Sequence, residues 1–375
     1  MKQGWELKKL GEVCEISTGK SNTEDATENG EYAFFDRSKV IKKSSNYLFD
    51  CAAIIVAGEG QTFLPKFYSG KFALHQRAYA IFNFNCKVNI DYAFKYLIHF
   101  HTYFEKVAVG ATVKSLRLRH FQDLPIPIPP LSEQERIVSI LDQAFSAIEQ
   151  AKINAEKNLK NAKELFDSYL TSVFTNKGHA WEEKKLGEVC ELKSGTTISP
   201  LLENNTGDII YTKIADMNLL TNEIEINTSS RFVNSKEIKL NQIIPNGAVI
   251  FPKRGGAIAT NKKRKIIKPT IVDLNTMAII PSKQINNDYF FHWFQLFDLN
   301  TISNGSNIPQ INNYSFDEVY ISYPMSLTEQ QAIVEKLDAL SAETKQLEVI
   351  YQQKLTELEN LKKSILQKAF NGDLC

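Results

Sequence analysis

Cysteine is scarce in this chain of 375 residues, which has five in all. They are an odd number, lie far apart and form no CxxC pair, so neither a disulfide framework nor a zinc cage is indicated. Cys14 and Cys190 occupy equivalent places in two copies of a repeated segment. We expect both to be small buried hydrophobic residues without a chemical role.

Long apolar runs are also missing. No stretch of about 18 apolar residues occurs, and the first residues, MKQGWELKKL, lack the apolar core of a signal peptide. The sequence therefore predicts a cytoplasmic protein with no membrane association. With 43% hydrophobic residues, a chain of this length is expected to form two globular units.

An excess of charge of one sign is absent as well. The formal net charge is +1, which excludes a uniformly basic coat for nucleic acid. Any nucleic-acid surface must therefore be a local patch.

Motifs of the common DNA-modifying enzymes are not found. The nearest match to the N-P-P-Y loop of adenine methyltransferases is NIPQ at Asn307, and the nearest match to a Gly-rich cofactor loop, AGEGQ at Ala57, is expected to be a turn. No GxxxxGK[ST] phosphate loop occurs, and His99 and His101 would not share one face of a helix. We expect a protein that is not an enzyme and has no cofactor or metal site.

Two repeats are written into the chain. WELKKLGEVCE (residues 5–15) returns as WEEKKLGEVCE (181–191), 176 positions later, and LSEQERIVSILD from Leu131 returns as LTEQQAIVEKLD from Leu327, 196 positions later. The stretches between them differ. The chain therefore consists of an opening, a variable region and a helix, followed by the same order again.

Each second repeat predicts the start of a long helix. Capping boxes are expected at Ser132 with Glu135 and at Thr328 with Gln331, and stop signals follow at residues 176–178 and 371–372. Apolar residues recur in steps of four and three, with one double-four step at the same place in both helices. This shared irregularity favours two helices that pack on each other over helices that each cover one domain. The expected seam consists of Ile137, Leu141, Ala144, Ile148, Ala151, Ala155, Leu159, Ala162, Phe166, Tyr169 and Val173 against Ile333, Leu337, Leu340, Thr344, Leu347, Tyr351, Leu355, Leu358, Lys362, Ile365 and Ala369, interrupted only at Thr344 and Lys362.

The two variable regions read as strand-rich domains. Short apolar runs such as AAIIVAG, RAYAIFNF, GAVIFP and TMAIIPS alternate with Gly, Asn and Pro turns, and helices are expected near residues 95 and 292. The predicted fold class is α+β: two strand-rich domains, each followed by a long helix, with the helices paired as an antiparallel coiled coil of approximate two-fold symmetry. The predicted boundaries are 1–130, 131–178, 179–326 and 327–375.

Basic clusters recur in both variable regions. Such clusters can neutralise phosphates, and interleaved Arg, Gln and Asn can read base edges. A single cluster of this kind is more often a solvated loop, but its recurrence in both halves favours double-stranded DNA as the partner. The candidate contacts, chosen on local charge, are Lys66, Arg77, Lys114, Arg117, Arg119 and His120 in the first half and Lys253, Arg254, Lys262, Lys263, Arg264 and Lys265 in the second.

Together, the tandem KKLGEVCE openings, the segments PPLSEQERIVSILD and SLTEQQAIVEKLD, and the tails LFDSYLTSVF and LKKSILQKAFNG resemble the DNA-specificity (S) subunit of type I restriction-modification systems. The resemblance covers nearly the whole chain. It implies two target recognition domains that each read half of a split DNA target, and a coiled coil that sets the spacer. It also implies two docked methyltransferase subunits, at residues 132–142, 328–338 and the outward helix faces, with motor-nuclease subunits added for cleavage.

Two other classes of function stay open at this point. One is a DNA-binding regulator that uses the same two domains without enzyme partners. The other is a coiled-coil adaptor whose end domains bind proteins or glycans, for which no salt-dependent affinity for duplex DNA is expected.

Overall fold

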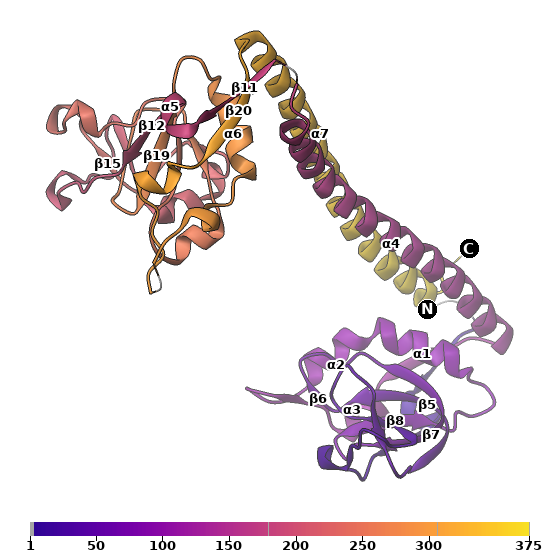
Figure 1. Ribbon diagram of the computed structural model, residues 1–375. Helices are drawn as coiled ribbons and strands as arrows, with labels where there is room; N and C mark the ends of the chain where they lie inside the picture. The colour runs from indigo at the N-terminus through magenta and orange to yellow at the C-terminus, as the bar shows by residue number, and fades with distance from the viewer. Residues whose placement is uncertain (1–3, 179, 306, 375) are drawn as a thin grey trace. The chain divides into compact units, whose positions relative to one another are not determined.

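The computed structural model describes residues 4–178, 180–305 and 307–374 (Figure 1). The chain divides into two compact units. Unit 1 comprises Met1–Asn158 together with Tyr351–Cys375, and unit 2 comprises Leu159–Ile350. The division cuts through both long helices, so each unit holds a strand-rich domain and parts of two helices. Residue 179, at which the second recognition domain was predicted to start, lies outside the described residues.

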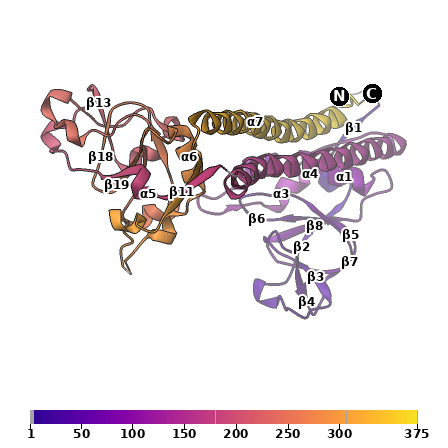
Figure 2. The ribbon, with the colours of Figure 1, turned by 45° about the horizontal axis from the view of Figure 1, so that its top comes forward.

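Unit 1 is built on a six-stranded sheet, in which only β3 and β7 run parallel (Figure 2). In spatial order the strands are β2 (Glu15–Thr18), β8 (Ala78–Phe82), β5 (Phe49–Ala57), β7 (Lys66–Leu74), β3 (Tyr32–Phe35) and β4 (Lys42–Ser44). Alternate residues of a strand face opposite sides of a sheet. Accordingly, Ile54 and Val56 of β5 enter the main core, and Ala53 and Ile55 enter a second cluster on the other face.

The remaining elements of unit 1 are short. They are α1 (Ile90–His99), α2 (His101–Val107), α3 (Leu118–Gln122), the antiparallel pair β1 (Glu6–Lys9) and β10 (Pro125–Ile128), the pair β6 (Glu59–Gly60) and β9 (Lys114–Ser115), and 3₁₀ turns at Leu10–Glu12 and Thr23–Asp25. The helices that the sequence predicts near residue 95 and the strands predicted at AAIIVAG and RAYAIFNF are confirmed as α1, α2, β5 and β8.

Unit 2 splits the corresponding strands between two sheets. A five-stranded sheet has the order β12 (Cys190–Ser194), β19 (Thr276–Pro281), β16 (Val249–Pro252), β17 (Arg264–Ile266) and β14 (Glu225–Ile226). A three-stranded sheet has β15 (Phe232–Val233), β13 (Ile209–Thr212) and β18 (Thr270–Val272). The runs GAVIFP and TMAIIPS are confirmed as β16 and β19.

Unit 2 also holds the pair β11 (Trp181–Lys185) and β20 (Tyr320–Pro324), the helices α5 (Leu186–Val189) and α6 (Asn287–Leu296), and 3₁₀ turns at Pro200–Leu202, Ile214–Asn218, Leu220–Asn222, Ser235–Glu237, Leu240–Gln242, Gly255–Thr260, Leu299–Ile302 and Asn313–Phe316. The helix predicted near residue 292 is confirmed as α6.

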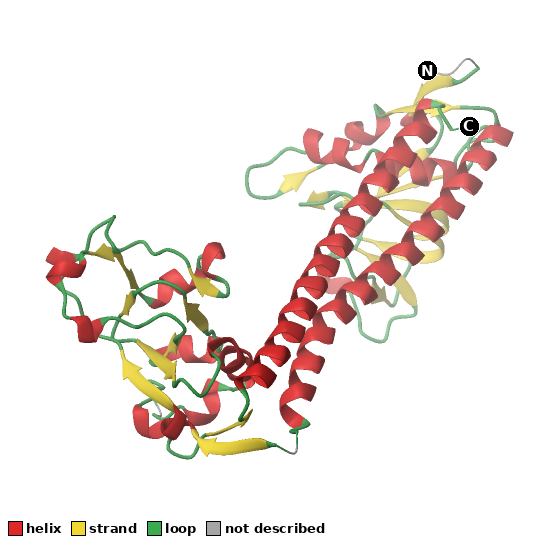
Figure 3. Cartoon of the chain, turned by 90° about the horizontal axis from the view of Figure 1, so that it is seen from above, coloured by secondary structure: helices red, strands yellow, loops and turns green. Residues whose placement is uncertain are grey.

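The two long helices are α4 (Leu131–Thr175) and α7 (Leu327–Asn371), which lie side by side and antiparallel (Figure 3). In unit 1, Ile137 from the start of α4 shares a core with Ala369 from the end of α7. In unit 2, Phe174 from the end of α4 packs on the same core as Val334 from the start of α7. The predicted helix pair is therefore confirmed.

The two expected interruptions of the seam are accommodated. Thr344 is buried, and its hydroxyl donates to Leu340 O at 2.9 Å. The Lys362 ammonium lies 5.1 Å from the centre of the Phe145 ring, a favourable cation–π contact. Leu347 departs from the prediction, because it remains 37% exposed.

The prediction that Ser132 and Thr328 cap the long helices is wrong. Both helices begin at the leucine, so Ser132 and Thr328 lie in the first turn instead of capping it. In α7 the cap is provided by Ser326, whose hydroxyl accepts from Glu329 N at 3.4 Å. The stop signals are confirmed, since the helices end at Thr175 and Asn371.

A buried glutamine accounts for the Glu-Gln pair that both copies of the second repeat contain. Gln134 is fully buried; its amide oxygen accepts from Asn89 N at 2.8 Å, and its amide nitrogen donates to Lys87 O and Pro129 O, each at 2.8 Å. This one side chain ties the start of α4 to the start of α1, where Asn89 is the cap.

The second copy repeats this arrangement. Gln330 accepts from Asn286 N at 2.7 Å and donates to Gln284 O at 3.0 Å and Pro324 O at 2.8 Å, and Asn286 caps α6. The repeated words therefore build the same joint between a recognition domain and a long helix in each unit.

The two repeated cysteines are structural. Cys190 is buried and Cys14 is half-buried, with its thiol directed to Leu10 O at 3.1 Å. Burial raises the pKa of both thiols to about 12. Neither is poised as a nucleophile, because only the thiolate attacks.

Candidate DNA interface

In unit 1 the structure brings two of the predicted contacts, Arg77 and Lys114, close to the strand pair β6 and β9. Arg77 forms an ion pair with Glu59, whose carboxylate also accepts from Ser115 Oγ at 3.2 Å. Lys114, the other residue of β9, donates to Glu105 O at 2.9 Å. Arg77 has 61% of its side chain exposed, so it is held by Glu59 and still open to a partner.

The other predicted residues of unit 1 lie elsewhere. The Lys66 ammonium donates to Ser38 O at 2.8 Å, and burial lowers the pKa of this lysine. Arg117 and Arg119 are exposed at the start of α3. His120 accepts from Arg117 N at 3.1 Å, and burial together with the two arginines lowers its pKa, so it adds no charge at neutral pH.

In unit 2, the side chains of Lys263, Arg264 and Lys265 bind mainly to other groups of the protein. Lys263 is buried and donates to Phe297 O at 2.5 Å and Asn261 Oδ1 at 2.9 Å. Burial lowers its pKa to about 8. This burial argues against a direct phosphate contact by Lys263.

Arg264 and Lys265 also have internal partners. Arg264 donates to Met217 O at 3.1 Å and Lys263 O at 2.8 Å. Burial acts to lower the pKa of Lys265, but its bonds to Glu225 and Asp288, each 2.9 Å, outweigh burial and raise it. Neutralising this pair would therefore disturb the packing of β17 on α6 as well as any DNA contact.

The last three predicted residues surround one turn. The Lys253 ammonium donates to Ser194 Oγ at 3.0 Å, and Lys262 donates to Asn218 Oδ1. Arg254 is exposed, and within the described part of the chain no side-chain hydrogen bond or ion pair of its guanidinium is found. Of the six candidates in unit 2, Arg254 is the one most open to an external partner.

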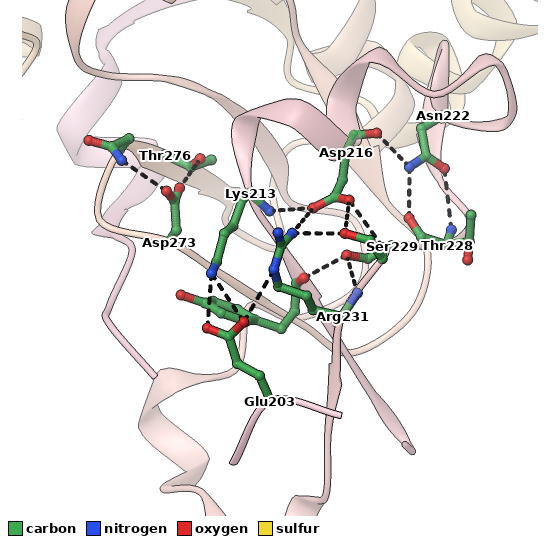
Figure 4. Close-up of polar contacts among 12 residues, drawn as sticks. Glu203, Lys213, Asp216, Asn222, Thr228, Ser229, Arg231, Asp273 and Thr276 are labelled. Atoms are coloured by element: carbon green, nitrogen blue, oxygen red, sulfur yellow. Dashed lines mark hydrogen bonds and ion pairs between the residues drawn. The ribbon is translucent and has the colours of Figure 1, made fainter. Parts of the chain in front are cut away.

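A second ordered cationic cluster lies beside β13, and the sequence did not indicate it (Figure 4). Lys213 and Arg231 converge on Glu203, with Nζ–Oε1 at 2.9 Å and Nε–Oε2 at 3.2 Å. About a third of each cationic side chain is exposed. The three residues come from separate segments, so a search for local runs of charge cannot find them.

Buried polar groups hold this cluster in place. Asp216 accepts from Ser230 Oγ at 2.8 Å and Lys213 N at 2.9 Å (Figure 4). Burial acts to raise the pKa of Asp216, but these hydrogen bonds outweigh it and lower the pKa, so the carboxylate stays ionised. The Asn222 side-chain amide connects the segments before and after it, because its nitrogen donates to Asp216 O at 2.9 Å and to Thr228 O at 2.7 Å.

Each unit also joins its recognition domain to a long helix through a polar contact at the aspartate that ends the second repeat, an ion pair in unit 1 and a hydrogen bond in unit 2. In unit 1, Lys95 of α1 pairs with Asp142 of α4. In unit 2, His292 Nε2 of α6 donates to Asp338 Oδ1 of α7 at 2.8 Å. Burial lowers the pKa of His292, although Asp338 and Asp288 act to raise it and Lys265 to lower it further.

The contact between His292 and Asp338 in unit 2 is expected to weaken in acid. A histidine whose pKa is lower in the folded chain contributes stability that is complete above its unfolded pKa of about 6.5 and is lost as the pH falls through the folded value. His292→Gln keeps a donor for Asp338. Between pH 7.5 and 5.0, the variant should therefore lose less unfolding free energy than the parent, as measured by urea titration at each pH. An equal loss in both proteins would contradict this assignment.

No helix in the described ranges is long and apolar enough to cross a bilayer. In the same ranges, no group of three or more His, Cys, Asp or Glu side chains is placed to bind a metal ion.

The two units share the same scaffold contacts and differ in their exposed polar residues, and the comparison with known families agrees with this duplication. The sequence matches the type I restriction modification DNA specificity domain twice, over residues 2–157 and 179–360. The chain belongs to this family. The match covers most of the chain and includes both repeats, so the resemblance noted from the repeated words is confirmed.

Individual relatives agree along the full length. The chain is 26% identical to the EcoDI specificity subunit of Escherichia coli over 99% of its length and 88% of that protein. It is 22% identical to the MjaIX specificity subunit of Methanocaldococcus jannaschii, over 99% and 93%. Both are specificity subunits of type I restriction enzymes, which favours the S-subunit interpretation over a stand-alone regulator or an adaptor.

Solved structures share the fold. One chain of a type I restriction-modification system superposes with a TM-score of 0.75 at 18% identity, with 100% of this chain and 99% of that one covered. The HsdS subunit from Thermoanaerobacter tengcongensis gives 0.65 at 18% identity, with 100% and 98% covered. The α+β fold with two recognition domains and a helix pair is thus that of a type I specificity subunit.

Proposed function

We propose that this chain is the DNA-recognition subunit of a type I restriction-modification complex, in which each recognition domain reads one half of a bipartite target. The observation that supports the proposal is the duplication of one specificity domain in a single chain. The repeated segments are nearly the same in both copies, whereas the stretches between them differ. The frame repeats its contacts between recognition domain and helix, from the buried Gln134 and Gln330 to the partly exposed contacts of Asp142 and Asp338. The exposed cations differ between the units, as two different half-sites require.

In this proposal the chain performs no chemistry itself. Two methyltransferase subunits dock on the first turns of α4 and α7 and on the outward helix faces, and motor-nuclease subunits join for cleavage. Arg77, Arg254, Lys213 and Arg231 supply partly exposed cations for duplex DNA, and the helix pair sets the spacer between half-sites. The complex acts in the cytoplasm, where its DNA target lies.

The decisive experiment is to co-express the chain with the methyltransferase subunit of its own system and to map methylated adenines by single-molecule sequencing. We expect two short defined words separated by a fixed undefined gap. Absence of new methylation, with the complex shown to be assembled and soluble, would reject the proposal.

Duplex binding should also depend on salt. Neutralising phosphates releases counterions, so the logarithm of the binding constant falls with the logarithm of salt, with a slope of about 0.9 per phosphate contact. With about four contacts, affinity for target DNA should fall about a hundredfold between 50 and 200 mM salt. Fluorescence anisotropy with labelled target duplex measures this, and a salt-independent affinity would point to a partner other than DNA.

A further inference from the structure

Unit 1 contains a small loop closed by backbone bonds beside the end of β5. Val109 and Ser115 exchange two hydrogen bonds of 2.9 Å, and Leu116 N donates to Gly58 O at 2.7 Å. The segment 109–115, which ends in β9, is therefore held by hydrogen bonds against the turn that follows β5 and against β6. In Figure 1, β6 lies at the margin of the unit, beside a loop that extends away from it.

Unit 2 has the same element in the same place, beside the end of β16. Asn304 and Gln310 exchange bonds of 2.8 and 2.7 Å, and Ile311 N donates to Lys253 O at 2.8 Å. Each of these residues lies 195 positions after its counterpart in unit 1. We call these the paired loops: residues 58–60 with 109–115 in unit 1, and 253–255 with 304–305 and 307–310 in unit 2.

A glycine at the same position shapes both loops. Gly110 has φ +137° and Gly305 has φ +110°. A side chain at Gly110 would place its Cβ 2.1 Å from Val113 O, and at Gly305 the distance to Ile308 O would be 2.6 Å. Both the dihedral angle and the space therefore require glycine, and this backbone is kept although almost all other residues of the loops differ.

The two loops present the same kinds of side chain. The residue three positions after each glycine is a β-branched aliphatic, Val113 in one and Ile308 in the other, exposed by 45% and 52%. The position that carries Glu59 in unit 1 carries Arg254 in unit 2, since both pair with the strand residue after the loop, Ser115 or Gln310. Glu59 itself holds Arg77. Each of the paired loops therefore has one exposed arginine at it. In unit 2 this is Arg254 of the loop itself, and in unit 1 it is Arg77, which directly precedes β8 and is held by Glu59.

We infer that the paired loops are the base-reading element of each recognition domain, with Arg77 and Val113 reading one half-site and Arg254 and Ile308 the other. The inference rests on the proposed function, because it assigns residues to that DNA contact. An exposed aliphatic side chain gains nothing from phosphates, whereas it gains contact with a thymine methyl group. An arginine beside it matches the O6 and N7 acceptors of guanine in the major groove, which is wide enough for such a two-stranded element.

The test uses the assembled methyltransferase complex and its methylation map. Arg254→Lys keeps the charge but loses the planar two-nitrogen fork of the guanidinium. Methylation should therefore fall about ten- to a hundredfold at sites with the parental unit 2 half-site sequence, and the base preference at one position of that half-site should become less strict. The word read by unit 1 should stay unchanged. Arg77→Lys should produce the mirror result, and Ile308→Ser and Val113→Ser should relax a neighbouring position in the matching half-site.

Lys9→Gln serves as a charge-removal control, because Lys9 belongs to the repeated opening and pairs with Asp123. It should leave both words intact. Thermal unfolding of each complex checks that the exposed substitutions leave the fold in place.

Three results would overturn the inference. One is that all four loop variants methylate the parental words at the parental rate. Another is that Arg254→Lys keeps full activity while Arg254→Ala weakens binding equally on all sequences, which identifies a phosphate contact. The third is a change in both half-sites from a single substitution. If the parent complex itself gives no bipartite methylation, the proposed function fails, which is a different outcome from unchanged words in the variants.

Discussion

Gln134→Leu is expected to lower the free energy of unfolding by about 3–5 kcal/mol, although it exchanges one residue of similar size for another. The substitution leaves Asn89 N, Lys87 O and Pro129 O without the partner that they have now. Each buried polar group left unpaired costs about 1–3 kcal/mol. The lower part of the summed range applies, because some of these groups can reach water once the joint loosens.

The repeated frame provides the control for this prediction. Amide hydrogen exchange should accelerate at the start of α1, which Gln134 holds, and stay unchanged at the start of α6, which Gln330 holds. Gln143→Leu changes an exposed glutamine of the same helix and should alter stability by no more than about 0.5 kcal/mol. Equal stability of the Gln134 and Gln143 variants would show that the buried amide does not hold the joint.

The scaffold could be predicted from the sequence because each copy of a repeated segment makes the same contacts in its own unit. Leu10 N donates to Leu124 O and Leu186 N donates to Val319 O, each at 2.8 Å, so the two openings fold alike. The helix seam was also predictable, since 3.6-residue periodicity depends only on local spacing. The role of the buried Gln134 was not predictable, because two of its three hydrogen-bond partners, Asn89 N and Lys87 O, lie about 45 positions away in the sequence.

Charge along the chain was a weaker guide to the DNA interface. Lys265 is a surface lysine by local sequence, yet Asp288 and Glu225 reach it from other elements. Lys213 and Arg231 were missed for the converse reason, since their meeting point at Glu203 is created by folding. The paired loops escape a sequence search because backbone hydrogen bonds define them, and the two loops have only two glycines in common, Gly60 with Gly255 and Gly110 with Gly305.

Shortening both long helices by one heptad is expected to change the spacer of the target and leave its two words unchanged. Removing residues 155–161 together with 351–357 takes out two seam positions from each helix and preserves the steps of four and three. The deleted segments lie close to the point where the division between the units crosses α4 and α7. Seven residues of helix correspond to about 10 Å, and at 3.4 Å per base pair the preferred gap should shorten by about three base pairs.

The rate should fall as well as the spacing. Three base pairs are about a third of a turn of B-DNA, so the half-sites also rotate relative to each other, and the protein or the DNA must twist to meet them. Methylation mapping of the double deletion should therefore return the parental words around a shorter gap, at reduced occupancy. A deletion in α4 alone puts the seam out of register and should give an unstable chain. If the double deletion kept the parental gap, the helix pair would not be the ruler, and if it changed the words, the helices would take part in reading bases.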